Sequence, residues 1–169
     1  MTFTLNIFRR QKMKFDIALR NLLIVLFGAL VLSACSTTKK SDLTGDVYTG
    51  TETIEYLAKG VPDRVFFATN KSSLTTAARD TLRKQSTWLR KNKDITVTIE
   101  GHADERGTRE YNLALGERRA NAAKDYLMTY GISGKRLSVI SYGKEKPVNP
   151  ASNPLAWSQN RRSVTVKAN

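Results

Sequence analysis

The sequence predicts an α/β (α+β) sandwich in which helices pack on a mixed four-stranded sheet, with the element order βαβαββ. The first observation is the alternation of apolar and polar residues over 95–100, which is typical of a strand with one buried face. The second is the helical spacing of apolar residues over 109–130. The third is a set of short runs rich in β-formers, which predict strands over 64–68, 137–142 and 163–167.

Capping residues and prolines define the elements further. Thr75 is the predicted N-cap of the first helix, whose apolar residues follow at helical spacing: Ala78, Leu82 and Leu89. The core stripe predicted for the second helix consists of Leu113, Gly116, Ala120, Ala123, Leu127 and Tyr130. Gly131 ends that helix, since glycine commonly follows a helix in the left-handed conformation. The segment 143–160 holds three prolines, and we expect it to be mostly loop.

The chain divides into three predicted parts: a lipoprotein signal peptide over 1–34, a lipidated cysteine with a flexible tether over 35–60, and one folded domain over 61–169. Residues 22–32 form an unbroken apolar run after a basic stretch. A membrane-spanning helix takes about 20 such residues, so this run is too short to span a bilayer and is typical of a secretory signal. Met13 offers an alternative start that gives a signal of more usual length.

The apolar run ends in Leu32-Ser33-Ala34-Cys35, which resembles the lipobox of bacterial lipoproteins. The resemblance implies that Cys35 carries acyl chains such as palmitate and becomes the first residue of the mature chain. Several acyl chains hold a protein stably in a bilayer, at about 0.8 kcal/mol per buried CH₂. Ser36 stands where an aspartate would indicate inner-membrane retention, so we expect an anchor in the outer membrane, on its periplasmic face. The alternative is a plain signal anchor with an incidental cysteine.

The net charge of +13 indicates either an acidic partner or a well-solvated surface. Five of the 28 basic residues and one of the 15 acidic residues precede Cys35, so the chain from Cys35 onward keeps a charge of +9. We expect no nucleic-acid partner, because the basic residues are spread along the chain and the signal directs it out of the cytoplasm. The single cysteine excludes an internal disulfide, and with a single histidine we expect no metal site and no cofactor.

A polar loop over 101–108 follows the second predicted strand and leads into the long helix. Asn112, Leu115 and Arg119 follow at i, i+3 and i+7, so they share a helix face that lies outside the core stripe. Asp104 from the loop and Arg119 from this face line one shallow predicted site, which suits a zwitterion because arginine binds a carboxylate through two parallel hydrogen bonds. Free N–H groups at the helix start can take a second carboxylate. Diaminopimelate in a peptidoglycan stem peptide carries these groups.

Each of these residues also has a structural interpretation. Asp104 could cap a turn, and Arg119 could pair with a surface acid. His102 is expected to orient the loop rather than to catalyse, and Glu105 and Arg106 are expected to face solvent. From spacing alone, the binding and structural interpretations of Asp104 and Arg119 stay equally open.

Four stretches carry a resemblance to a known family: EGHADERGTREYN (100–112), LGERRANA (115–122), SYGKEKP (141–147) and NRR (160–162). Over 64–166 the chain resembles the OmpA-like peptidoglycan-binding domain. With its lipobox and tether it resembles, more narrowly, the peptidoglycan-associated lipoproteins of the Tol–Pal system. The resemblance implies non-covalent binding of diaminopimelate-containing stem peptides, which tethers the outer membrane to the cell wall and serves envelope integrity and cell division.

The resemblance also assigns residues and a second partner. The family's aspartate and arginine fall on Asp104 and Arg119, with Leu115 on the apolar wall beside them. The further residues expected at the ligand are Asn70 and Asn112, and those expected to support the site are Arg161 and Thr108. The implied protein partners are TolB, whose surface would overlap the peptidoglycan site, and other Tol proteins.

One departure from the family pattern lies after the first strand. Many relatives have aspartates where this chain has Ala68 and Asn70. Asn70 still donates and accepts hydrogen bonds but carries no charge. We therefore expect affinity or the preferred stem peptide to differ.

Two other classes of function remain as alternatives. Glu100, Asp104 and Glu105 are carboxylates close in sequence, and glycan cleavage uses carboxylate pairs. The chain offers no Ser–His–Asp order or second cysteine to support catalysis, so we expect no enzyme. A purely structural lipoprotein is the other alternative, in which the charges at Asp104 and Arg119 would not matter for wall binding.

Overall fold

The computed structural model describes residues 43–44, 46–50 and 55–168, so the predicted signal peptide and Cys35 lie outside it. In chain order its elements are β1 (Leu43–Thr44), β2 (Val47–Tyr48), β3 (Tyr56–Ala58), β4 (Val61–Pro62), β5 (Arg64–Phe66), α2 (Thr76–Lys91), β6 (Val97–His102), α3 (Arg109–Thr129), the 3-10 helix η2 (Gly134–Arg136), β7 (Leu137–Gly143), α4 (Pro154–Asn160) and β8 (Arg162–Lys167). No helix within these ranges is long and apolar enough to cross a membrane.

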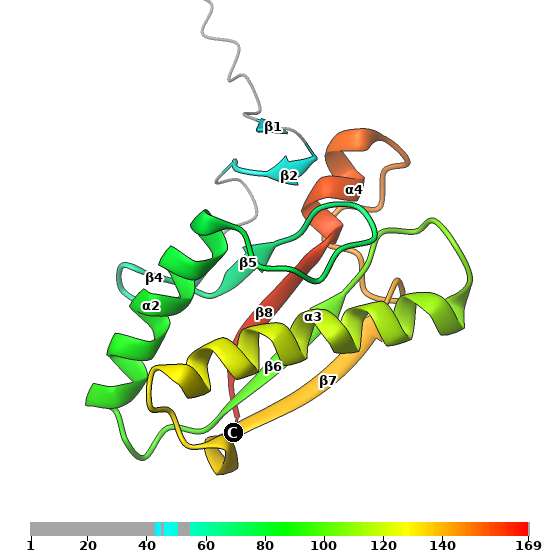
Figure 1. Cartoon of the computed structure of the whole chain (residues 1–169). Coiled ribbons are helices and arrows are strands. Elements are labelled where there is room, and N and C mark those ends of the chain that lie inside the picture. Colours follow the sequence, from blue (N-terminus) through cyan, green and yellow to red (C-terminus); the bar gives the residue numbers. More distant parts are fainter. Residues whose placement is uncertain (1–42, 45, 51–54, 169) are drawn as a thin grey trace, which may run out of the picture. The chain divides into compact units, whose positions relative to one another are not determined.

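Four strands form one mixed sheet in the order β5-β8-β6-β7. β6 and β7 pair in parallel through the crossover helix α3, whereas β8 is antiparallel to both of its neighbours. The helices α2 and α3 cover the same face of this sheet (Figure 1). The predicted sandwich of helices on a mixed four-stranded sheet is thus confirmed.

The core lies between that sheet face and the two helices. Its buried members are Val65, Phe67, Ala78, Leu82, Leu89, Val97, Ile99, Ala120, Ala123, Leu127, Ile132 and Leu137. The alternation predicted for the second strand is visible in β6, where Val97 and Ile99 are buried and their neighbours are half-buried. Thr75 caps α2 as expected, since its hydroxyl accepts a hydrogen bond from the Ala78 N–H at 3.1 Å.

The prediction of loop over 143–160 is wrong for its last seven residues, which form α4. Asn153 is the N-cap and accepts from the Ala156 N–H at 2.9 Å, and Pro154 occupies the first turn. Proline is favoured there because the first helical N–H groups have no partner within the helix. The prolines of this segment favoured a loop, whereas Asn153 and Pro154 begin a helix.

The buried face of α3 is wider than predicted. Leu113 and Tyr130, from the expected core stripe, are only half-buried, whereas Asn112, Leu115 and Arg119 are buried. The reason is a second cover, because the segment after β5 lies against α3 and supplies backbone carbonyl groups to Arg119. The Asn112–Arg119 face, which was expected to lie outside the core stripe, is thus covered by that segment.

Parts of the predicted tether are paired and packed. β1 pairs with β2, and β3 pairs with β4, as two short antiparallel hairpins. Tyr48 is buried and packs edge-on against the ring of Phe66, with the ring centroids 4.8 Å apart. Leu57 is buried as well, while Tyr56 is exposed.

The closest approach of α3 to β6 depends on two glycines. A Cβ added at Gly101 would overlap the Gly116 carbonyl group, and one added at Gly116 would overlap the Ser141 hydroxyl. We predict that Gly101→Ala lowers the free energy of unfolding by about 3 kcal/mol, because the added methyl separates α3 from β6. Urea denaturation monitored by circular dichroism measures this loss.

Gly134→Ala is the matched control for that substitution. Its added Cβ would lie 3.4 Å from the end of the flexible Met128 side chain. We expect it to cost less than about 1 kcal/mol. Equal stability of the two variants would contradict the proposed close packing.

Candidate functional site

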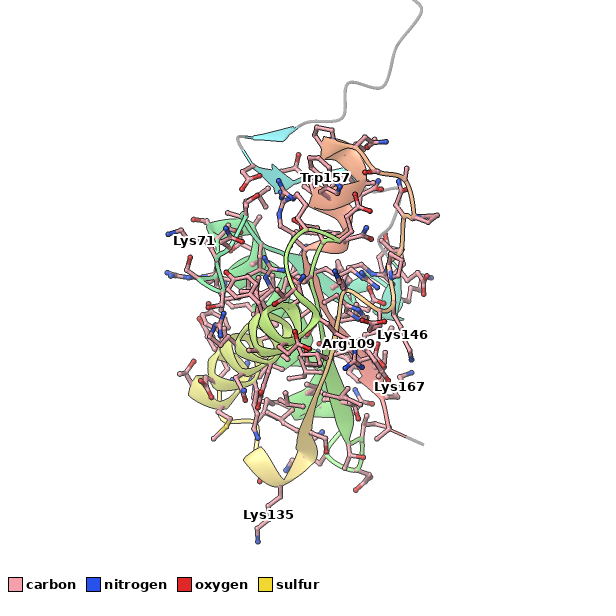
Figure 2. All side chains as sticks on the ribbon, turned by 90° about the vertical axis from the view of Figure 1, so that its right-hand side faces the viewer. Lys71, Arg109, Lys135, Lys146, Trp157 and Lys167 are labelled. Carbon is pink, nitrogen blue, oxygen red and sulfur yellow. The ribbon has the colours of Figure 1, made fainter. Side chains whose placement is uncertain are left out.

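The predicted site residues gather at one edge of the sheet. β5, β6 and β7 all run in the same direction, because β8 lies between β5 and β6 and is antiparallel to both. The carboxyl ends of these three strands and the amino end of β8 therefore meet at that edge. Asp104 follows β6, residues 67–71 follow β5, and Arg161 directly precedes β8. Trp157 of α4 marks this end of the domain in Figure 2, and Lys135 marks the opposite end.

Asp104 is buried and accepts hydrogen bonds from two arginines. Its Oδ1 accepts from the Arg106 N–H and Nε, both at 3.1 Å. Its Oδ2 accepts from Arg106 Nη2 at 2.7 Å and from Arg161 Nη1 at 3.4 Å. Burial opposes ionisation of Asp104, but the hydrogen bonds from Arg106 outweigh it and hold the pKa of the carboxyl below its usual value. Asp104 is therefore a fixed anion at neutral pH.

Arg119 is fully buried and donates to three backbone carbonyl groups. Nε donates to Lys71 O at 2.9 Å, Nη1 to His102 O at 2.8 Å and Nη2 to Ala68 O at 3.1 Å. Burial, and next the positive charge of Arg161, lower its pKa to about 10, which still leaves it charged at neutral pH. No ion pair joins Arg119 to Asp104 among the residues described.

Arg161 is the second cation that contacts Asp104. It is also buried, and its Nε donates to Phe67 O at 3.0 Å. Its Nη2 donates to Asp46 Oδ1 at 2.8 Å. Arg161 thus links Asp104, the segment after β5 and Asp46, which lies between β1 and β2.

The other predicted residues surround this centre without forming one surface. Leu115 and Asn112 are buried, and Asn112 Nδ2 holds the loop by donating to Arg106 O at 2.8 Å. Thr108 is the N-cap of α3, and its hydroxyl accepts from the Tyr111 N–H at 3.2 Å. That N–H, one of the donors expected to be free at the helix start, is therefore already used. Asn70 is exposed and has a φ of 55°.

Sequence reasoning missed the part played by Arg106. This residue is exposed, as expected, but its guanidinium also binds Asp104, reaches Thr69 Oγ1 at 3.3 Å and stacks 4.3 Å from the Trp157 ring. Glu105, exposed as well, accepts from Trp157 Nε1 at 2.8 Å, which fixes the loop to α4. No pattern along the chain pointed to the two contacts with Trp157, because they depend on α4, which was predicted as loop.

The arginines at this edge outnumber the carboxylates of the loop. The arginines are Arg106, Arg119 and Arg161, and the loop carboxylates are Asp104 and Glu105. Asp46 supplies a third carboxylate from the segment before β2. The arrangement suits acceptance of an anionic group. Among the residues described, no cluster of three or more metal-ligating side chains occurs.

This domain belongs to a known protein family. Residues 66–161 match the OmpA family, and the chain belongs to that family. Within it, the chain is 47% identical over 156 residues to the peptidoglycan-associated lipoprotein of Rhizobium meliloti, with 89% of each chain covered. It is 43% identical over 157 residues to the protein of that name from Brucella melitensis, covering 89% of this chain and 94% of the relative.

Solved structures of other proteins have the same fold as this chain. The crystal structure of the peptidoglycan-associated lipoprotein from Burkholderia pseudomallei superimposes with a TM-score of 0.61 and 35% identity, covering 63% of this chain and 90% of that chain. The C-terminal domain of Helicobacter pylori MotB, at 19% identity and a TM-score of 0.59, covers 63% of this chain and 84% of its own, and shares the fold.

His102 is a buried residue at the end of β6 that stacks on Tyr142. Neither ring nitrogen has a hydrogen bond within the described chain, and Glu100 Oε2 lies 3.6 Å from Nε2. Burial, and next the charges of Arg162 and Lys146, lower its pKa from 6.5 to about 3. The imidazole is thus neutral in the folded protein throughout the ordinary pH range.

We predict that this histidine makes the fold sensitive to acid. Between pH 6.5 and about 3 the unfolded chain binds a proton at His102 and the folded chain does not. Its contribution to stability is full above pH 6.5 and falls by about 1.4 kcal/mol per pH unit as the pH drops through this window. His102→Phe, which keeps the ring stack, should lose less stability than wild type between pH 7 and pH 4 in urea denaturation. Parallel pH profiles of the two proteins would refute this role.

Proposed function

We propose that this chain is an outer-membrane lipoprotein, anchored through Cys35, that binds diaminopimelate-containing peptidoglycan stem peptides without cutting them. The observation that carries the proposal is the buried aspartate set among three arginines at the loop edge of an OmpA-family domain. Relatives covering most of this chain bear the name peptidoglycan-associated lipoprotein, which supports the same ligand class.

The contacts suggest how a zwitterionic residue would bind. Asp104 is the acceptor for the ligand's ammonium group, which would replace the Arg106 guanidinium. That exchange is feasible because the Arg106 side chain is 41% exposed, whereas Arg161 is buried on the other side of the carboxylate. A ligand carboxylate would be taken by Arg161 and by the backbone N–H and hydroxyl of Thr69, which already bind a carboxylate in this structure.

Arg119 is assigned a positioning role in this proposal. Its donors hold the backbone at Ala68, Lys71 and His102, and its side chain has no exposed surface. Arg119→Ala would remove all three of these hydrogen bonds, one of them buried, so loss of binding in that variant would not separate a ligand contact from loss of the fold. Leu115 and Asn112 support the loop from within, and Asn70 shapes the turn beside Thr69.

The proposed cellular role places the chain between the outer membrane and the cell wall. Acyl chains on Cys35 would hold it at the periplasmic face, and the domain would hold the wall. TolB and other Tol proteins are the proposed protein partners, in envelope integrity and cell division. These partners follow from the sequence resemblance to the lipoproteins of the Tol–Pal system.

The electrostatics favour binding over catalysis. A glycosidase needs a carboxylic acid that keeps its proton near neutral pH, which requires a raised pKa. The pKa values of Asp104 and Glu105 are both lowered, Asp104 chiefly by Arg106 against the opposing effect of burial, and Glu105 by hydrogen bonds from Ser152 and Trp157. These loop carboxylates are therefore suited to attract a cation.

We predict that Asp104→Asn weakens co-sedimentation with purified sacculi at least about tenfold, because the ammonium group loses its buried counter-charge. Free diaminopimelate should release the wild-type protein from sacculi. Asp94→Asn is the matched control, since Asp94 is exposed in the turn before β6, next to η2 at the other end of the domain. Circular dichroism should show that both variants are folded. Wild-type sedimentation of the Asp104→Asn variant would rule out this site.

A further inference from the structure

Asp46, from the segment predicted as tether, occupies the positive edge of the site. Its Oδ1 accepts from Thr69 Oγ1 at 2.9 Å and from Arg161 Nη2 at 2.8 Å. Its Oδ2 accepts from the Thr69 backbone N–H, and its backbone carbonyl accepts from Arg161 Nη2. A hydroxyl, a backbone N–H and a guanidinium thus converge on one carboxylate.

This carboxylate is held as a ligand carboxylate would be held. The donors Thr69 and Arg161 belong to the folded domain, at the ends of β5 and β8. The acceptor comes from a segment more than twenty residues earlier in the chain than Thr69. The hydrogen bonds from the Thr69 N–H and hydroxyl, followed by the charges of Arg161 and Arg106, overcome the effect of partial burial and lower the pKa of Asp46. Asp46 is therefore charged at neutral pH.

The segment that carries Asp46 contacts the domain through few side chains. We call residues 46–50 the strap. The strap is held by the Asp46 carboxylate and backbone carbonyl and by the buried ring of Tyr48, which packs on Phe66. Beside this ring contact, a cavity of about 130 Å³ lies between the strap, β5 and α2, with walls from Tyr48, Val65 and Ala78 among others. The Asp46 side chain is half exposed, so water and ligand reach the contact from outside.

We propose that Asp46 is an internal competitor for the carboxylate subsite: the strap closes the site in the absence of ligand, and a bound stem peptide displaces it. This inference rests on the proposed function and adds a means of regulating the same site. The apparent affinity for ligand is then reduced by the fraction of molecules in which the strap is docked. An exposed carboxylate contact of this kind suggests a moderate reduction, on the order of three- to tenfold.

Displacement of the strap also changes the reach of the domain from its anchor. With Asp46 docked, the chain from Cys35 to the domain spans at most about 36 Å, at about 3.3 Å per residue. Release of the chain up to Glu55 adds about 30 Å. Under this proposal, ligand binding also lengthens the connection between the domain and the membrane, because both require that the contact between Asp46 and Arg161 breaks.

The test compares the full-length wild type with Asp46→Asn and with the control Asp94→Asn, which removes one exposed acid at the opposite end of the domain. The probe is the tripeptide L-alanyl-γ-D-glutamyl-meso-diaminopimelate, and the readout is its dissociation constant by calorimetry. We expect Asp46→Asn to bind about three- to tenfold more tightly, because asparagine keeps the size of the side chain and removes its charge. Asp94→Asn should bind like wild type.

The outcomes separate the two proposals. If wild type binds the tripeptide and Asp46→Asn binds it with equal or lower affinity, Asp46 is not a competitor, and the proposed function still stands. Absence of binding by both proteins overturns both. A second readout is the Thr69 amide resonance of the ligand-free protein, which should move on Asp46→Asn and, in wild type, move in the same direction when tripeptide is added. If the Thr69 resonance does not shift in Asp46→Asn, the contact between Asp46 and Thr69 does not form in solution. That result would also overturn the proposal that Asp46 competes with the ligand.

Discussion

The guanidinium of Arg119 has no exposed surface and donates to the carbonyl groups of Ala68, Lys71 and His102. A buried cation without a carboxylate partner is tolerated only when hydrogen bonds replace its hydration, and bonds from a charged donor stabilise by about 1.5–3 kcal/mol each. Because two of these carbonyl groups follow β5 and the third ends β6, Arg119 fixes the loops after β5 and β6 relative to each other. The distance between Thr69 and Asp104, and with it the shape of the site, depends on this side chain together with Arg106 and Arg161, which also join the two loops.

The positive charge of the chain is partly concentrated where Arg119 holds these loops. Three arginines stand against two loop carboxylates, Asp104 and Glu105, so one positive charge is left for the strap or a ligand to neutralise. The sequence suggested a basic excess spread along the chain, because Arg106, Arg119 and Arg161 are far apart in it. Topology brings them together, since the carboxyl ends of parallel strands share one edge of the sheet. An anion is therefore needed at this edge whether or not wall peptide is present.

The fold followed from patterns that burial imposes along the chain, namely the alternation in β6, the apolar stripe of α3 and the cap at Thr75. Asp104 and Arg119 could be proposed as site residues because both lie within a short segment around the β6–α3 turn. The partners of Arg119 could not be predicted, because they are carbonyl groups of a segment about 50 residues away. Every residue has a backbone carbonyl group, so the residue types do not reveal which of them accept. The Asp46 contact was hidden for the same reason, being a pairing across 115 residues within a segment of tether-like composition.

Asn70 has a physical role in this setting. Asn70 has a φ of 55°, a left-handed conformation that asparagine and aspartate adopt more readily than other residues with a side chain. Asparagine therefore suits the turn that presents the Thr69 N–H and adds no charge there. An aspartate at this exposed position would add a negative charge beside the place where a carboxylate binds, and would repel the strap and the ligand alike. With asparagine, the Thr69 and Arg161 subsite faces its carboxylate without that repulsion, so in this chain Asp46 is the acid from outside the loop that contends with the ligand for it.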